Sequence, residues 1–423
     1  MKRLPSWVIS ANAAGSDFPL NNLPYGVASI DGGQPFCCVA IGDRVLNLAG
    51  MQAAGFVDAK ASLQAGSWNA FMALGKNDWH ILRLSLTTLL TDGALMQSET
   101  EKYMLELSKL EMHMPFHVAE FTDFYSSKDH ATNVGTMFRG AENALPPNWL
   151  HIPIGYNGRA SSVVVSGTSV RRPWGQVKGP DETVPRYAPS ARFDIELELG
   201  AIVGQSSNGP ISVDQAYENI FGYVLLNDWS ARDIQAWEYQ PLGPFQSKAT
   251  ATSISPWIVT KAALEPFRVS TPAREKQLLP HLRDTTAMLY DIKLDVGLAP
   301  QGQSETIIAR TNYSAMYYSA AQQLAHHTSS GCPMRVGDLL GSGTISGSSK
   351  KSSGSLLELS WGGKEPFTLD TGESRSFIED GDTLTFYGYA TAKDYRIGFG
   401  SCAGKLIPAT HADRVKDNTK SHN

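Results

Sequence analysis

The sequence predicts an α+β fold with mainly β structure, divided into a small N-terminal domain and a larger second domain. Short apolar segments separated by turn residues recur in both parts of the chain, which is typical of β structure. One long stretch has leucines at helical spacing and ends at a proline. A length of 423 residues suits two domains. We therefore expect an N-terminal domain over residues 1–118, a second domain over residues 119–416 and a polar tail over residues 417–423.

The composition points to a globular protein that acts on small molecules. Hydrophobic residues make up 42% of the chain, and the formal charge of −5 comes without a basic stripe that would bind nucleic acid or an anionic membrane. The chain shows no signal-peptide pattern and no apolar run long enough to cross a bilayer, so we expect a cytoplasmic protein without a membrane partner. The four cysteines lack Cys-x-x-Cys spacing, which predicts buried free thiols in a reducing compartment.

Residues 1–118 combine short strands with helices. Phe18–Leu48 contains strand-like segments separated by the turn signals Asp31-Gly32-Gly33 and Gly42-Asp43. From Ser67 to about Met114 the pattern is helical, and it is carried by Leu82, Leu84, Leu86, Leu89, Leu90, Leu105, Leu107 and Leu110. Met114-Pro115 then ends this helical region.

The second domain begins with a polar segment, Phe121–Gly140, that suits a functional site better than a core. We place Asp123 at a strand end or in a loop, and His130 at the start of a helical turn. A single histidine is more often structural than functional, so His130 alone decides nothing. The following segment, Leu145–Trp174, is rich in proline and glycine, which predicts an ordered loop with a function.

Polar and apolar residues alternate over Arg192–Gly200, which predicts a half-buried strand with Asp194, Glu196 and Glu198 on one face. Adjacent carboxylates on that face would lie about 6.6 Å apart. At an effective dielectric constant of about 20 they would repel by about 2.5 kcal/mol, so a buried face needs a cation. On an exposed face the repulsion falls below about 1 kcal/mol and needs no ion. The strand alone leaves both interpretations open.

A second polar cluster follows a predicted helix at Val213–Ile220. The apolar strand within Phe221–Lys248 places Asp228 at its end, and Ser230 can cap a short helix that carries Arg232 and Gln235. Lys248 ends the run after two prolines. Taken singly, Asp228 could equally be a residue at a helix start.

The rest of the chain carries fewer signals of chemistry. Asn312–Thr328 predicts a helix that ends in His326-His327, where imidazolium would suit the helix dipole. The glycine-rich stretches Gly341–Gly347 and Gly398–Gly404 do not match a dinucleotide-binding loop. We find no nucleophile elbow, phosphate loop, calcium hand or helical zinc pair. The segment from Gly388 to Gly400 predicts closing strands.

Six segments, in this order, resemble the fumarylacetoacetase (fumarylacetoacetate hydrolase) family. They are Asp123–Ser127 with His130–Gly135, Gly155–Ser162, Asp194–Glu198, Asn227–Gln235, Ser342–Gly347 and Gly398–Gly404. Each is weak alone, whereas together they extend the resemblance over nearly the whole chain. The resemblance implies a small β-barrel-like N-terminal domain, a mixed-β-sheet catalytic domain and a homodimer. It also implies metal-dependent hydrolysis of a carbon–carbon bond in 4-fumarylacetoacetate, a small diketo acid, to fumarate and acetoacetate in the last step of tyrosine and phenylalanine catabolism.

The resemblance implies a role for each site residue. Metal ligands for Ca²⁺ and/or Mg²⁺ would be Asp123, Glu196, Glu198 and Asp228, and a set of four carboxylates is independently typical of hard cations. A second ion position would be bordered by Asp228, Lys248 through its backbone carbonyl, and Thr252. Catalytic residues would be His130 as the base, Glu358 as its orienting carboxylate, and the donors Arg232, Gln235 and Lys248. Substrate would be contacted by Tyr125, Arg139, Tyr156, Gln235, Tyr239 and Thr344, with Arg139 as the carboxylate clamp.

Two departures from the family pattern and two alternatives accompany this assignment. Ala251 stands where we expect a glycine beside the second ion, and Lys128-Asp129 precedes His130 in place of the usual pair. Within the wider superfamily, related sites hydrolyse acylpyruvates or decarboxylate and isomerise 2-oxo diacids. In another class, the carboxylates could belong to a calcium-binding scaffold, although a scaffold needs no base such as His130 with Glu358.

Overall fold

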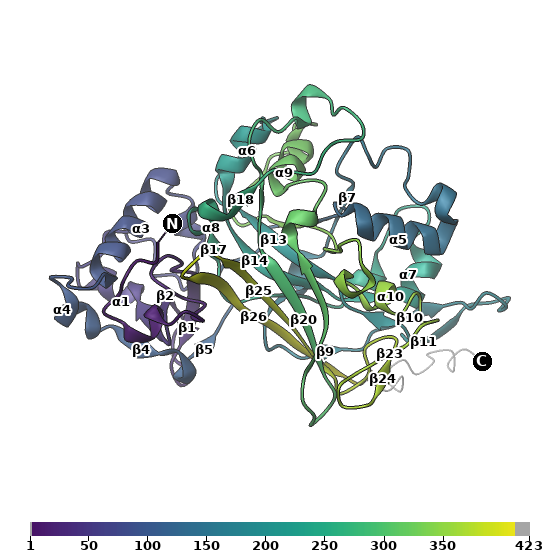
Figure 1. Ribbon diagram of the computed structural model, residues 1–423, viewed down its shortest axis with the longest axis horizontal. Helices are drawn as coiled ribbons and strands as arrows, with labels where there is room; N and C mark the ends of the chain where they lie inside the picture. Colours follow the sequence, from purple (N-terminus) through teal and green to yellow (C-terminus); the bar gives the residue numbers. More distant parts are fainter. Residues whose placement is uncertain (1, 411–423) are drawn as a thin grey trace, which may run out of the picture.

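Five short strands of the N-terminal part form one antiparallel sheet in the computed structural model, which describes residues 2–410. The sheet order is β4-β3-β2-β1-β5, and the strands are β1 (Tyr25–Ser29), β2 (Phe36–Ile41), β3 (Arg44–Asn47), β4 (Met104–Glu106) and β5 (Glu111–Met112). Helices α1 (Leu48–Ala53), α2 (Asn69–Met72), α3 (Lys76–Leu90) and α4 (Gln97–Glu101) surround it, as Figure 1 shows on its left side. The predicted β unit over Phe18–Leu48 is confirmed.

The predicted helical stretch from Ser67 to Met114 is correct only in its first part. Helix α3 buries Leu82, Leu86 and Leu90, while Leu84 points to solvent. Leu105 instead belongs to strand β4, where it pairs with Val45 of β3. The pairing of a distant strand therefore overrides local leucine spacing at this position.

The larger part of the chain contains two sheets that pack face to face. The first has the order β7-β6-β22-β13-β14-β16-β8, with β17 paired to β14, and its strands are β6 (Phe121–Phe124), β7 (Gly155–Asn157), β8 (Val163–Val165), β13 (Leu197–Val203), β14 (Ile220–Asp228), β16 (Thr252–Ile254), β17 (Val259–Thr260) and β22 (Leu339–Gly341). The second has the order β21-β20-β25-β26-β9, with β9 (Val170–Arg171), β20 (Lys293–Ala299), β21 (Thr306–Asn312), β25 (Thr383–Thr391) and β26 (Arg396–Ile407). Three pairs, β6 with β22, β8 with β16 and β9 with β26, are parallel. This arrangement confirms an α+β, mainly β fold.

A large apolar core lies between the two sheets. Leu225 of β14 and Phe386 of β25 are fully buried in it, together with Trp229 and Phe399. The sheets approach closely at Gly404 of β26, where an added Cβ atom would lie 2.6 Å from the indole ring of Trp229. Only glycine permits this contact, so Gly404 helps to fix how β26 crosses the other sheet.

Helices lie on two sides of this body (Figure 1). Helices α6 (Val213–Asn219) and α9 (Ala320–Thr328) pack together at the top in this view, near α8 (Lys261–Leu264). At the opposite end from the N-terminal part lie α5 (Lys128–Arg139), α7 (Arg232–Glu238) and α10 (Leu356–Leu359). Small strand pairs are β10 (Trp174–Val177) with β11 (Arg186–Pro189), β12 (Phe193–Asp194) with β15 (Ser230–Ala231), β18 (Arg268–Val269) with β19 (Leu289–Tyr290), and β23 (Phe367–Thr368) with β24 (Ser374–Arg375). Short 3-10 helices occupy Ile9–Asn12, Leu107–Lys109, Ala141–Asn143, Ala160–Ser162, Gln246–Lys248, Glu265–Phe267, Pro280–Leu282, Tyr313–Ala315 and Lys350–Ser352.

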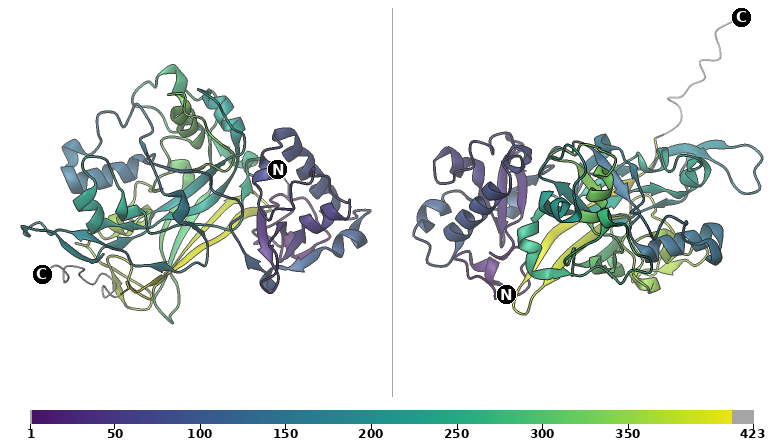
Figure 2. Two further views of the ribbon diagram at one scale, coloured as in Figure 1. Left: turned by 180° about the vertical axis from the view of Figure 1, so that it is seen from behind. Right: turned by 90° about the horizontal axis from the view of Figure 1, so that it is seen from above.

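The N-terminal part and the first sheet share a core. Tyr25 of β1 stacks on Trp68 with ring centroids 4.3 Å apart and also contacts Phe221 of β14. The tip of the β25–β26 hairpin reaches the N-terminal part, where Arg396 forms a 2.6 Å ion pair with Asp17 (Figure 2). The domain boundary near residue 118 stays a prediction, and the predicted tail over residues 417–423 lies outside the described residues.

Three local predictions need correction. Arg192–Gly200 forms two strands, β12 and β13, because the chain leaves the ladder between them at Ile195 and Glu196. The helix expected over Asn312–Thr328 begins only at Ala320, where the Ser319 side chain accepts a hydrogen bond from the Gln322 amide in a capping box. Ser230 does not cap α7, because it lies in the β12–β15 ladder opposite Asp194 and its hydroxyl donates to the Asp228 carbonyl.

Two expectations concern compartment and thiols. Within residues 2–410, no helix has the length and apolar character needed to cross a membrane.

All four cysteines are free, and Cys37, Cys38 and Cys402 are buried as predicted, whereas Cys332 is partly exposed.

We expect a thiol reagent to modify one cysteine rapidly in the native protein and four after unfolding. Burial raises the pKa of the Cys37 thiol to about 12, so this group has neither solvent access nor thiolate character at neutral pH. Time-resolved labelling with a chromogenic disulfide tests this expectation, and Cys332→Ser should remove the fast phase. A fast phase of more than one thiol would contradict the packing around Cys37 and Cys38.

Candidate active site

A cavity of about 380 Å³ lies beside β6, between helices α5 and α7. Most of the predicted site residues line it: Asp123, Tyr125, His130, Arg139, Tyr156, Glu196, Arg232, Gln235, Tyr239, Lys248 and Thr344. Glu198, Asp228, Thr252 and Glu358 do not line it and are buried. A more open cavity of about 690 Å³ elsewhere is lined by Lys128, Asp295 and Arg310, among others, and contains none of the clustered carboxylates.

Sequence reasoning missed the apolar wall of the cavity, which is formed by Val134, Phe138, Ile154, Leu242 and Pro244. A signal for part of it was present in the sequence. His130, Val134 and Phe138 follow one another at intervals of four residues and therefore share one face of α5. Phe138 remains 51% exposed, so this wall can still bury a substrate surface.

Adjacent strands bring four carboxylates together. Asp123 lies near the end of β6, Glu198 lies in β13, Asp228 ends β14, and Glu196 immediately precedes β13. One oxygen from each of the four residues lies within 4.8 Å of the others, and all four side chains are buried. Gly341 of β22 faces two of them, and an added Cβ atom would lie 2.8 Å from both Asp123 Oδ1 and Glu198 Oε2. The buried interpretation of the acidic strand is therefore correct, because Asp194, Glu196 and Glu198 are all buried, and the last two belong to the cluster.

The cluster has more negative charge than its protein partners neutralise. Burial and the neighbouring carboxylates raise the pKa values of Asp123 and Glu198 well above their usual range. Burial opposes ionisation of Glu196 too, but Lys248 and Arg232 outweigh it and lower that pKa to about 2. Asp123 Oδ1 and Glu198 Oε1 are buried without a hydrogen-bond partner. A hard divalent cation such as Ca²⁺ or Mg²⁺ takes carboxylate oxygens of this kind, so the residues fit a metal site.

Lys248 places a positive charge at the cluster, as Arg232 does at Glu196. Its ammonium group donates to Glu196 and to Asp228 Oδ2, the latter at 2.8 Å. Thr252 lies opposite Asp228 in the β14–β16 ladder and donates to Asp228 Oδ1 at 3.2 Å, while the Tyr156 hydroxyl donates to Oδ2. The Ala251 side chain is buried next to Thr252.

His130 forms a buried pair with Glu358. Ser127 caps α5 by accepting from the His130 amide, which places the histidine in the first turn. The ring Nδ1 lies 2.7 Å from Glu358 Oε2. Because a carboxylate only accepts, Nδ1 carries the proton, and Nε2 is the ring nitrogen available to the cavity.

Glu358 is itself held as a carboxylate. It also accepts hydrogen bonds from Asn133 Nδ2 at 2.9 Å and from the Ser346 and Ser355 hydroxyls. Burial raises its pKa, but the charge of protonated His130 and these hydrogen bonds outweigh burial, so the pKa is lowered overall. An ionised Glu358 can therefore fix the orientation of the imidazole.

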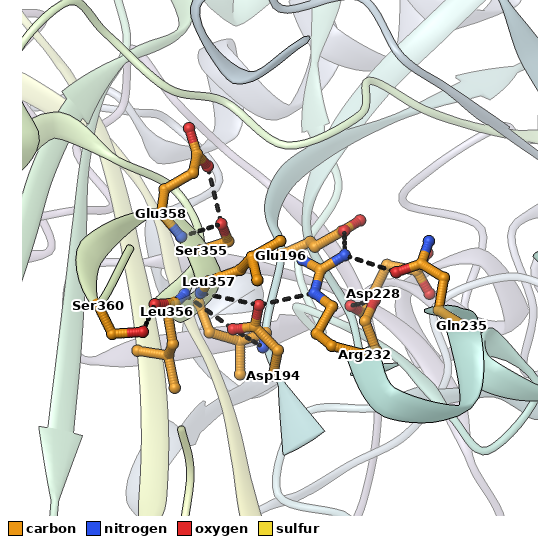
Figure 3. A network of polar contacts seen from close by, with 12 residues as sticks. Asp194, Glu196, Asp228, Arg232, Gln235, Ser355, Leu356, Leu357, Glu358 and Ser360 are labelled. Carbon is orange, nitrogen blue, oxygen red and sulfur yellow. Dashed lines mark hydrogen bonds and ion pairs between the residues drawn. The ribbon is translucent and has the colours of Figure 1, made fainter. Parts of the chain in front are cut away.

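Arg232 lies between two carboxylates, as Figure 3 shows. Its Nε donates to Asp194 Oδ2 at 2.8 Å, and its Nη1 lies 2.7 Å from Glu196 Oε1 and donates to Gln235 at 3.1 Å. Its Nη2 is buried without a partner. Asp194, predicted on the same face as Glu196 and Glu198, lies outside the four-carboxylate cluster because the strand breaks after it.

The residues predicted to contact substrate lie around the cavity, and their side chains differ in how firmly neighbouring groups hold them. Arg139 ends α5 and donates from Nε and Nη2 to the carbonyls of Asn143 and Ala144. Tyr125 packs edge-on against the His130 ring with centroids 5.4 Å apart. The Thr344 hydroxyl is buried without a partner, and Tyr239 is partly exposed at the rim.

The fold and the site define a class: an enzyme with a buried cluster of carboxylates, suited to a cation, beside a histidine–glutamate pair. Family models match two parts of the chain, "Fumarylacetoacetase N-terminal" over residues 21–115 and "Fumarylacetoacetate (FAA) hydrolase C-terminal" over residues 120–406. The chain belongs to the fumarylacetoacetate hydrolase family.

Named relatives agree with the family models. The chain is 47% identical to human fumarylacetoacetase over 409 residues, which cover 94% of the chain and 98% of the relative. It is 45% identical to the Arabidopsis thaliana fumarylacetoacetase, over 93% of the chain and 96% of the relative. A solved fumarylacetoacetate hydrolase from Exiguobacterium antarcticum is 14% identical with a TM-score of 0.52, over 92% of this chain and all of that one, and shows the shared fold.

Proposed function

We propose that the protein hydrolyses 4-fumarylacetoacetate to fumarate and acetoacetate. The carrying observation is the His130–Glu358 pair, whose His130 lines the same cavity as Asp123 and Glu196 of the carboxylate cluster. The fumarylacetoacetases that match along almost their whole length support this substrate. Water adds its oxygen to the carbonyl carbon next to the fumaryl double bond, the bond from that carbon to the adjacent methylene breaks, and the methylene takes the electron pair and then a proton.

His130 acts as the general base in this proposal. The unprotonated Nε2 accepts a proton from water, and the carboxylate of Glu358 stabilises the imidazolium that results. Stabilising the imidazolium requires an ionised Glu358, and the lowered pKa of Glu358 supports that state. The scaffold alternative has no use for such a pair.

Donors at the cavity stabilise the developing enolate. Arg232 Nη2 has no protein partner, and Gln235 lies beside the guanidinium on the next turn of α7. Lys248 contributes a fixed positive charge at the carboxylate cluster. Because these groups are already oriented by buried contacts, little reorganisation is needed when charge develops.

The carboxylate cluster would hold Ca²⁺ and/or Mg²⁺ through Asp123, Glu196, Glu198 and Asp228. When bound, such an ion polarises a carbonyl and neutralises oxyanion charge. We further propose a second Mg²⁺ position bordered by Asp228, Thr252 and the backbone carbonyl of Lys248, which the adjacency of Thr252 and Asp228 supports.

Tyr125, Tyr156, Gln235, Tyr239 and Thr344 would contact the substrate, and Arg139 would bind a terminal carboxylate. All of them line the cavity. The apolar wall suits the carbon chain of a diketo acid, and the guanidinium of Arg139 retains a donor in Nη1, because only Nε and Nη2 are engaged.

We expect Arg139→Leu to raise KM by roughly 10–100-fold for acidic diketones, since a hydrogen bond to a charged group contributes about 1.5–3 kcal/mol. Neutral diketones should lose little affinity, so the selectivity for the acid should fall. Steady-state kinetics on both substrates tests this, with Arg139→Lys as the matched variant that keeps the charge. Unchanged selectivity at an unchanged thermal midpoint would remove Arg139 from the site.

A coupled assay tests the proposed function itself. Loss of diketone absorbance is followed with fumarylacetoacetate and with an acylpyruvate, before and after chelation, and then after addition of Ca²⁺ or Mg²⁺. We expect preference for fumarylacetoacetate, loss of turnover with chelator and recovery with one of the two ions. Preference for the acylpyruvate would favour the wider superfamily activity, and turnover that survives exhaustive chelation would exclude a metal-dependent mechanism.

We also propose that the protein is a cytoplasmic homodimer that acts in the last step of tyrosine and phenylalanine catabolism. The β10–β11 hairpin projects from the body in both views of Figure 2 and exposes Val184 and Tyr187, which are suitable for burial against a partner. Light scattering coupled to size-exclusion chromatography distinguishes a dimer from a monomer.

A further inference from the structure

The strongest unexplained contact of the site lies behind the cavity, at Asp194. This side chain is fully buried and does not line the cavity. Its carboxylate nevertheless accepts four hydrogen bonds: Oδ1 from the amides of Ile195 (2.7 Å) and Leu356 (2.8 Å), and Oδ2 from the amide of Leu357 (3.0 Å) and from Arg232 Nε (2.8 Å). Both oxygens are therefore fully engaged (Figure 3).

One pair of these contacts fixes helix α10. Leu356 and Leu357 are its first two residues, whose amides have no partner inside a helix. The next residue is Glu358, whose backbone amide donates to the capping Ser355 and whose carboxylate binds His130. Asp194 thus holds the start of the helix one residue away from the group that orients the base.

The remaining contact fixes Arg232. With Nε bound to Asp194 and Nη1 bound to Glu196 and Gln235, the plane of the guanidinium is determined on two sides. The direction of its unpaired Nη2 is therefore fixed as well. Of the three side chains paired with Arg232 in the described part of the chain, Asp194 is the one whose carboxylate also accepts hydrogen bonds from the first turn of α10.

We infer that Asp194 is a positioning residue that sets the base pair His130–Glu358 and the oxyanion donor Arg232 relative to each other. The inference rests on the proposed hydrolysis, because the two groups must act on one substrate. The proton acceptor and the oxyanion donor sit on different elements, α5 with α10 and α7. The Asp194 carboxylate bonds directly to Arg232 and to the start of α10, so a change there should displace both at once.

Asp194→Asn tests the inference. The amide is close in size but places an NH₂ group against two N–H donors, so one side of the network must open. We expect kcat to fall by roughly 10–100-fold, as for other outer-shell partners of a site, while KM changes by less than about threefold because Asp194 does not touch the cavity. Asp194→Asn should lower kcat less when Glu358→Gln is already present, since the contact through which Glu358 orients His130 is then already weakened.

Asp382→Asn is the matched control. Asp382 is also buried and pairs with an arginine, accepting from Arg375 Nε at 2.9 Å and Nη2 at 3.0 Å and from the Glu379 amide, but it does not line the cavity. Asp382→Asn should lower the thermal midpoint and leave kcat per folded molecule unchanged. An equal loss of kcat in both variants, or unchanged kcat in Asp194→Asn, would overturn the inference.

A readout independent of turnover separates this inference from the proposed function. In ¹⁵N-histidine-labelled protein, the Nδ1 proton of His130 is assigned by its absence in His130→Asn. We expect that resonance to shift or broaden in Asp194→Asn and to stay in place in Asp382→Asn. A wild-type protein without diketone turnover would remove the proposed function, while this spectrum would still decide whether Asp194 orients His130. An unperturbed resonance would overturn the inference.

A second pair of variants serves if Asp194→Asn does not fold. Leu356→Ala shortens the side chain but keeps the backbone amide that donates to Asp194. Leu356→Pro shortens the side chain and also removes that amide donor. Proline is tolerated at the first helical position, and Ser355 is already extended (φ −138°, ψ 153°) as the residue before a proline requires. We expect kcat to be lower for Leu356→Pro than for Leu356→Ala, and equal values would overturn the inference.

Discussion

Asp228→Ala is expected to leave a folded protein that lacks bound metal and has lost at least about 10³-fold in kcat. The metal would contribute several kcal/mol of charge stabilisation, and each ~1.36 kcal/mol corresponds to a factor of ten. Asp228 is the carboxylate that Lys248, Thr252 and Tyr156 all contact, so its removal also frees the Lys248 ammonium from one of its two hydrogen-bond partners. Glu196→Ala should behave similarly, with the added loss of the Arg232 contact.

Metal content and thermal midpoint distinguish this result from simple misfolding. Chelation should lower the midpoint of the wild type, because it leaves buried carboxylates to repel one another, whereas it should scarcely change that of Asp228→Ala. Asp382→Ala removes a buried aspartate elsewhere and should keep both metal and kcat. Wild-type activity in Asp228→Ala would remove the carboxylate cluster from the reaction.

His130→Asn is expected to lower kcat by roughly 10²–10⁴-fold, the usual contribution of a positioned base. The fold and the metal content should be retained, because His130 is not one of the four residues of the carboxylate cluster. Glu358→Gln should cost less, since it removes charge and orientation but leaves the imidazole in place.

A histidine outside the cavity provides the control. His113 accepts or donates at 2.7 Å to Ser29 in the N-terminal sheet, and it does not line the cavity. His113→Asn should change stability alone. If His130→Asn instead showed a lower midpoint with normal turnover in the folded fraction, His130 would be structural; a stable protein without metal would make it a partner of the metal site.

Local signals in the sequence predicted the elements whose causes are local. The apolar run before Asp228 forms β14 and ends at that residue, and Val213–Asn219 forms α6 behind a Ser212 capping box. The hairpin strands of the N-terminal sheet follow their turn residues. In each case the deciding contacts lie within a few residues of one another.

Features that depend on distant partners could not be predicted from local pattern. Leu105 pairs with Val45 in a strand although its spacing is helical, and Asp194 leaves the acidic face because β12 pairs with β15. Glu358 stands in an ordinary Leu-Glu-Leu sequence, and its contact with His130 spans 228 positions in the chain. Only the family resemblance drew attention to it, and the position of Asp194 behind the site required three-dimensional structure.

The parallel pairing of β6 with β22 has a consequence for the order in which the protein can fold during synthesis. Asp123 reaches its place only when Gly341 pairs beside it, so more than half of the chain must follow Asp123 off the ribosome first. Until then β6 lacks the neighbour that lies between it and β13, and Asp123 remains apart from the carboxylates that the direct β13–β14 pairing brings together. Pairing between such distant segments is slow and leaves apolar strands unpaired meanwhile. Nascent chains that end before residue 341 should therefore depend on chaperones, and substitutions that weaken β22 should reduce the yield of native protein more than its stability once folded.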